Sequence, residues 1–160
     1  MSKVKAVHVK WIALCTFVAL LLVTTRFTCE SEESRAAKAR QKLREFEGIM
    51  NVKFPPSTRL LNYRAEDAWM DEYIGLKIEI ARDDLESFLN NSPFAGKRLK
   101  SKKDNPIFSV RSTGPRWWKV KSVNEWLSGN VMLPQTEGLR ILLDMDHAHT
   151  VIIYLEWLDT

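Results

Sequence analysis

The order of apolar and polar positions divides this chain into segments with different periodicities. An uncharged apolar run at 11–25 is followed by a charged stretch at 31–47 that contains neither Gly nor Pro. Beyond the prolines at 55 and 56, apolar residues recur at every second position or in short runs. A period of two is typical of strands with one buried face. The pattern therefore predicts an apolar N-terminal helix, a polar helix and a sheet domain.

The N-terminal run has the layout of a membrane anchor or a secretory signal. It extends from Trp11 to Thr25 and is preceded by three lysines, Lys3, Lys5 and Lys10. Such lysines stay on the cytoplasmic side while the apolar run enters the hydrocarbon. We expect residues 1–10 to form a cytoplasmic tail. We expect residues 11–27 to form a transmembrane signal anchor that contacts membrane lipid.

A cleaved signal peptide is the alternative to a retained anchor. Val23-Thr24-Thr25 is a poor match to the small-x-small pattern of a cleavage site, and Arg26 and Phe27 are unfavourable beside one. These residues favour retention, which makes the product a single-pass membrane protein with its domain outside the cytoplasm. Cleavage would instead yield a secreted or periplasmic protein.

The charged stretch that follows the anchor is rich in strong helix formers. One narrow apolar stripe runs along it with 3-4-3-4 spacing, formed by Ala36, Ala39, Leu43, Phe46 and Met50. We expect a juxtamembrane stalk helix over residues 28–50, which Gly48 either stops or loosens. Its stripe either docks on the following domain or marks where two copies touch.

The predicted domain comprises residues 51–160. Near its start, the prolines of Phe54–Ser57 mark the boundary with the preceding helix. Alternating apolar residues at 74–80 predict a strand, and Leu60–Tyr63 is a plausible strand before it. The apolar runs 139–143 and 151–158 flank a polar segment, which predicts a C-terminal β-hairpin.

Two short helices are expected between these strands. Asp83 with Glu86, and Ser122 with Glu125, have the spacing of a capping box. The first predicts a helix at 83–90, and the second predicts a helix that ends at Gly129. The fold class is therefore α+β, with an antiparallel sheet and the helices on one face.

Composition and charge narrow the functional classes. The chain has 160 residues, of which 45% are hydrophobic and 28% charged, as expected of a globular domain. Residues 1–30 hold four basic residues and one acidic residue, so most of the formal charge of +4 lies there. The near-neutral remainder gives no electrostatic footprint for nucleic acid, and we expect no nucleic-acid partner.

Motifs of enzyme chemistry are not found. The sequence has no Gly-rich phosphate loop, no Gly-x-Ser-x-Gly and no His-Glu-x-x-His. One stretch combines four metal-binding residue types, Asp144, Asp146, His147 and His149. Neighbouring residues of a hairpin point to opposite faces, so we interpret this stretch as a solvated turn. A metal-assisted hydrolase is the weakest hypothesis, and we assign no catalytic, metal or cofactor residue.

The most unusual local feature is the sequence Arg116-Trp117-Trp118-Lys119. If these residues form a strand, one indole faces outward between two cations and can contact a protein partner, a glycan or the membrane interface. The alternative is that both tryptophans cover a small core. We expect a membrane-anchored protein with a binding or structural role. The alternative is a secreted inhibitor or immunity-type binder.

Overall fold

The computed structural model describes residues 32–67, 72–104, 118, 122–134 and 137–159. The chain divides into two compact units, Met1–Lys38 and Ala39–Thr160, and the second contains the sheet and its core. The predicted tail and anchor, 1–27, lie outside the described residues. Within the described ranges, no helix is both long and apolar enough to cross a membrane.

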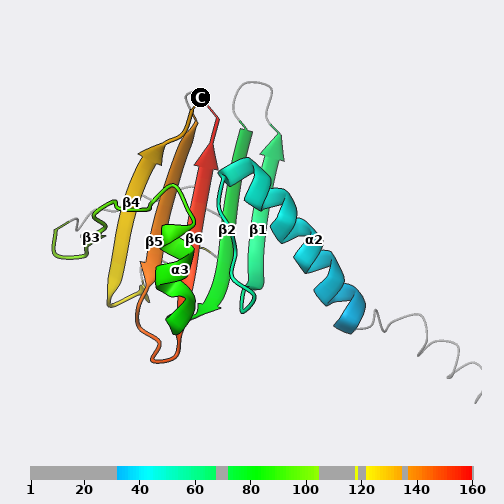
Figure 1. The fold of residues 1–160 in the computed structure, drawn as a ribbon, viewed down its shortest axis with the longest axis horizontal. Coiled ribbons are helices and arrows are strands. Elements are labelled where there is room, and N and C mark those ends of the chain that lie inside the picture. Colours follow the sequence, from blue (N-terminus) through cyan, green and yellow to red (C-terminus); the bar gives the residue numbers. More distant parts are fainter. Residues whose placement is uncertain (1–31, 68–71, 105–117, 119–121, 135–136, 160) are drawn as a thin grey trace, which may run out of the picture. The chain divides into compact units, whose positions relative to one another are not determined.

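Six antiparallel strands form one sheet in the order β1-β2-β6-β5-β4-β3 (Figure 1). In chain order, the elements are α2 (Glu32–Met50), β1 (Arg59–Asp67), β2 (Glu72–Ala81), the 3-10 turn η1 (Arg82–Asp84), α3 (Leu85–Asn90), β3 (Lys100–Ser101), β4 (Trp126–Met132), β5 (Gly138–Asp144) and β6 (Thr150–Leu158). An antiparallel sheet with helices confirms the predicted α+β class.

The two strand patterns that were strongest in the sequence lie at the centre of the sheet. Strand β2 pairs with β1 on one side and with β6 on the other. Its Leu76, Ile78 and Ile80 side chains are fully buried, which confirms the period-two prediction. Strands β5 and β6 pair from Gly138 and Leu158 onward, which confirms the C-terminal hairpin.

The main core lies on the face of the sheet that α2 and α3 cover (Figure 1). Leu43, Phe46 and Met50 of α2 are buried in it, whereas Ala36 is exposed. The C-terminal half of the apolar stripe thus docks on the domain. The helix continues through Gly48 to Met50, the last residue of the expected range 28–50. It ends before Asn51, whose φ of 52° lies in the left-handed region that often terminates helices.

The predicted helix at 83–90 is present as η1 and α3, but the capping box expected at its start is not formed. Helix α3 begins at Leu85, and its N-cap residue is Asp84, which makes no side-chain capping bond. The Asp84 carboxylate instead accepts a hydrogen bond from the Ser57 hydroxyl. A box formed by Asp83 and Glu86 would need Asp83 at the N-cap position.

The predicted helix before Gly129 is a strand. Trp126–Met132 forms β4, which pairs with β5 along its whole length. Trp126 and Ser128 are buried, whereas Leu127 between them is only half-buried. This pairing satisfies the backbone of β4 through β5, a partner that local spacing does not reveal.

Candidate binding site on the outer face of the sheet

The face of the sheet opposite α2 and α3, here the outer face, carries side chains in cross-strand rows. Met132 of β4 is opposite Gly138 of β5, which is opposite Leu158 of β6. The next row places Arg140 of β5 opposite Glu156 of β6. Paired residues in an antiparallel ladder point to the same face, so these side chains are neighbours.

Arg140 and Glu156 form an ion pair in the middle of this face. Arg140 Nη1 lies 3.2 Å from Glu156 Oε2, and the exposed fractions of the two side chains are 38% and 3%. A carboxylate this deeply buried is costly unless it is paired. Arg140 therefore compensates Glu156 while part of its guanidinium group still reaches solvent.

A glycine beside this pair makes room for an aromatic ring. Gly75 of β2 is opposite Glu156, and a Cβ atom at Gly75 would lie 2.6 Å from the hydroxyl oxygen of Tyr73. The Tyr73 phenol thus lies over Gly75. Any larger residue at position 75 would have to displace the end of the Tyr73 side chain.

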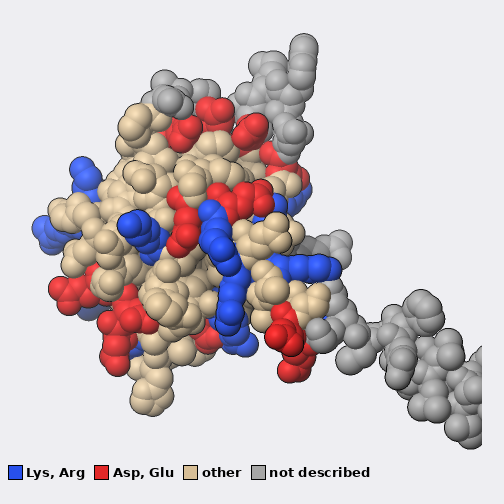
Figure 2. All heavy atoms as spheres, turned by 45° about the vertical axis from the view of Figure 1, so that its right-hand side comes forward, with Lys and Arg blue, Asp and Glu red and all other residues tan. Residues whose placement is uncertain are grey.

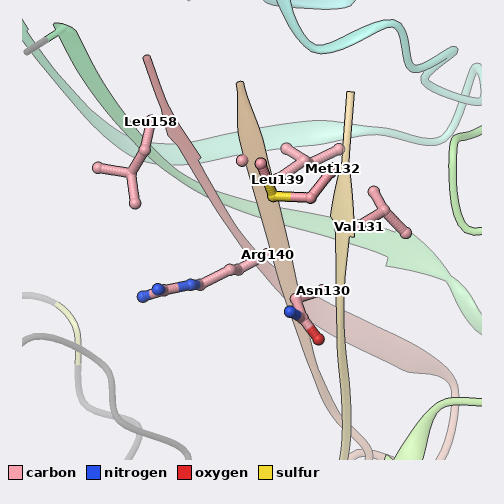
Figure 3. Close-up of a pocket in the computed structure, with 7 residues that line it drawn as sticks. Asn130, Val131, Met132, Leu139, Arg140 and Leu158 are labelled. Atoms are coloured by element: carbon pink, nitrogen blue, oxygen red, sulfur yellow. The ribbon is translucent and has the colours of Figure 1, made fainter. Parts of the chain in front are cut away.

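A pocket of about 140 Å³ opens at the end of β4, β5 and β6 (Figure 3). It is lined by Asn130, Val131, Met132, Gly138, Leu139, Arg140 and Leu158. A Cβ atom at Gly138 would meet nothing within 4 Å, so the missing side chain contributes to the hollow. Met132 is 70% exposed beside it. A volume near 150 Å³ holds a small apolar group such as benzene, so this pocket suits one aliphatic side chain.

An aromatic cluster occupies another part of the outer face. The rings of Trp118 and Tyr154 meet edge to face at a centroid distance of 5.1 Å. Burial, together with the nearby Asp144 carboxylate, raises the pKa of Tyr154 to about 12. The Lys77 ammonium lies 5.1 Å from the centre of the Tyr154 ring. This cluster is a second, smaller core.

The predicted partner-binding residues are only partly within the described structure. Trp118 is half-buried against Tyr154, a contact that fits the interpretation in which the tryptophans cover a small core. Arg116, Trp117 and Lys119 lie outside the described residues. A partner-binding role for this sequence stays a prediction.

The turn between β5 and β6 is held by hydrogen bonds to residues outside it. Asp146 accepts hydrogen bonds from the backbone N–H groups of Asn124 and Glu125, at 2.8 and 2.7 Å, and these bonds lower the pKa of Asp146. Arg82 Nη2 donates to the carbonyl oxygens of Met145 and His147, at 2.9 and 2.6 Å. In the described part of the chain, no three His, Cys, Asp or Glu side chains lie close enough together to hold a metal ion.

The residues of the pocket and the ion pair were not singled out in the sequence. The available signal was weak: Arg140 and Glu156 are single charges inside otherwise apolar runs, Leu139–Leu143 and Val151–Leu158. A charged side chain in a buried strand is costly unless it is paired with an opposite charge. Only the strand register identifies which residue provides that charge. Comparison with protein-family models, curated proteins and solved structures finds no match to this chain.

Proposed function

We propose that this chain is a single-pass membrane-anchored binding protein whose α+β domain lies outside the cytoplasm. Two features support the proposal. One is the basic, then apolar, N-terminal sequence, which resembles a signal anchor. The other is the pocket on the outer face of the domain, beside the exposed Met132 side chain.

The exposed Met132 is the observation that carries the binding role. A long, flexible thioether side chain that borders a small apolar pocket is typical of adaptable contact surfaces. The pocket accommodates one aliphatic side chain, and the half-exposed Arg140 guanidinium provides a hydrogen-bond donor at its rim. The partner that best fits this chemistry is a protein segment that inserts an aliphatic residue beside a carbonyl or carboxylate oxygen.

Site-specific photo-crosslinking in intact cells tests this site. A benzophenone amino acid in place of Met132 should give one discrete protein adduct. The same amino acid in place of Glu86, which is exposed on α3, should not. A Cβ atom at position 138 would meet nothing within 4 Å, so Gly138→Leu should fill the pocket and abolish the adduct. An adduct that persists in Gly138→Leu, or that forms equally from position 86, would rule out the pocket as the docking site.

The anchor is tested separately through the topology of the whole chain. Protease added outside spheroplasts should digest residues beyond 30 and leave a small N-terminal fragment in the membrane. Replacement of Lys3, Lys5 and Lys10 by Glu should weaken correct insertion, because positive charge is the main orientation signal. A soluble product that lacks residues 1–25 would establish the cleaved-signal alternative. A fully protected domain would reverse the orientation.

A further inference from the structure

Strand β1 is a long edge strand that is open to solvent. It has nine residues, Arg59–Asp67, and among the described residues it pairs only with β2. Residues 62–66 are exposed on both faces of the sheet. The outer edge of β1 thus presents backbone N–H and C=O groups that can pair with another strand.

The side chains of this edge carry both signs of charge. Arg64 and Glu66 point to the same face and form an ion pair with each other. Figure 2 shows Lys and Arg interspersed with Asp and Glu over the side of the domain that carries α2 and β1. An edge of mixed charge disfavours indiscriminate pairing and favours a strand whose charges match in register.

Geometry limits how a second copy of β1 can pair with the first. Two identical antiparallel strands in one sheet are related by a two-fold axis perpendicular to the sheet. Residues that face each other across the two strands must point to the same side of the sheet. The two-fold axis therefore has to pass beside a residue that faces the same residue of the second copy. Each symmetric pairing is therefore named by one central residue.

Charge selects among the central residues in the regular part of β1. A centre at Arg64 or at Glu66 places like charges directly opposite each other, which is destabilising. A centre at Ala65 places Arg64 opposite Glu66 of the second copy, and Glu66 opposite Arg64. The four charges then alternate in sign around the axis, and the small Ala65 side chains meet at its centre.

Centres nearer the start of β1 conflict with its irregularity. The register of β1 against β2 shifts between Leu60 and Asn62. A centre at Asn62 or Tyr63 would place this bulge inside the new ladder and disrupt its pairing. A centre at Ala65 needs only residues 63–67 of each copy, which follow the bulge. The centre of this ladder lies beyond Tyr63, the residue whose ring contacts Phe46 of α2.

We infer that two copies of this chain pair antiparallel through β1, with Ala65 facing Ala65, and so join their sheets into one. This interface is separate from the pocket of the proposed function. It supplies a second partner for β1, which among the described residues pairs only with β2. Its strength depends on one short ladder and four charges, so it should respond strongly to charge reversal.

Disulfide cross-linking of the full chain in its membrane tests the register. Both native cysteines, Cys15 and Cys29, are first replaced by Ser. Ala65→Cys should then oxidise to a covalent dimer, because directly opposite Cβ atoms lie about 4.5–5.5 Å apart. Asn62→Cys is the matched control, since the two copies of position 62 would be six residues, or about 20 Å, apart.

Paired charge reversal tests the contact between Arg64 and Glu66. In the Ala65→Cys background, Arg64→Glu alone and Glu66→Arg alone should each reduce the dimer several-fold. Differently tagged copies of the two single variants, expressed together, should form mainly mixed dimers, because every facing pair is then opposite in charge. The pair within each chain stays broken in this mixture, so intrachain repair cannot explain the recovery.

Three results would overturn the inference. The first is a chain that stays monomeric in the Ala65→Cys variant, or that cross-links at least as well through position 62. The second is a mixture of the two charge variants in which mixed dimers are no more abundant than like dimers. The third is an adduct to a different protein in place of the dimer, which would assign the edge to a heterologous strand.

Discussion

The ring of Phe46 on α2 lies 5.5 Å, between centroids, from the ring of Tyr63 on β1, at an interplanar angle of 60°. Phe46 is fully buried, whereas Tyr63 is 45% exposed. The Lys42 ammonium lies 5.4 Å and 5.6 Å from the two ring centres. This contact joins the C-terminal half of α2 to the edge strand, so the predicted stalk helix is partly a structural element of the domain.

Phe46→Ala should therefore destabilise the sheet domain and not only the helix. Loss of a buried Phe costs about 3–5 kcal/mol through lost burial and the cavity left behind. Arg44→Ala, at an exposed position on the same helix, is the control and should change the free energy of unfolding by less than about 0.5 kcal/mol. Urea unfolding of both variants checks this. Equal midpoints would mean that α2 does not belong to the cooperative unit.

Ile78→Ala should destabilise the domain far more than Lys77→Ala. Ile78 is fully buried in the main core, and its truncation should cost about 2–5 kcal/mol. Lys77 points to the outer face, where its ammonium lies over the Tyr154 ring, so its loss should cost about 1 kcal/mol at most. Thermal melts of the two variants compare these costs. Similar melting temperatures would contradict the register of β2.

Arg140→Met should be more harmful than the double variant Arg140→Met with Glu156→Met. Removal of the cation alone leaves the Glu156 carboxylate buried without its partner, which costs about 3–5 kcal/mol. Replacement of both charges by apolar side chains removes that penalty. A double-mutant cycle on the free energy of unfolding measures the coupling. Additive effects would show that the two charges do not interact in the folded state.

Tyr154 should make stability fall as the solution becomes strongly alkaline. Its folded pKa, about 12, lies above the ordinary value of 10.0, so the folded state retains a proton that the unfolded state releases. The stabilisation is complete below pH 10 and is lost as pH rises toward 12. Unfolding free energies measured across this range should decline less steeply for Tyr154→Phe. Identical slopes would mean that this phenol is not buried.

The strongest local patterns were enough to predict several elements. The alternating apolar residues of β2, and the paired apolar runs of β5 and β6, bury one face or both, so their periodicity reports strand structure directly. The spacing at Asp83 coincided with a helix that lacks the capping bond, whereas the spacing at Ser122 precedes strand β4. Nothing in the local sequence of β4 identifies its partner.

What the sequence by itself determined was the composition of each segment: a basic and apolar N-terminus, a helix with one apolar stripe, and strands with alternating or fully apolar faces. The tertiary structure decided which strands are neighbours. Insertion of β6 between β2 and β5 places Glu156 between Gly75 and Arg140, residues that are 65 positions apart in the chain. Strand pairing depends on backbone hydrogen bonds and burial that distant segments complete together. For this reason, the ion pair, the pocket and the open edge of β1 exist only in the folded sheet.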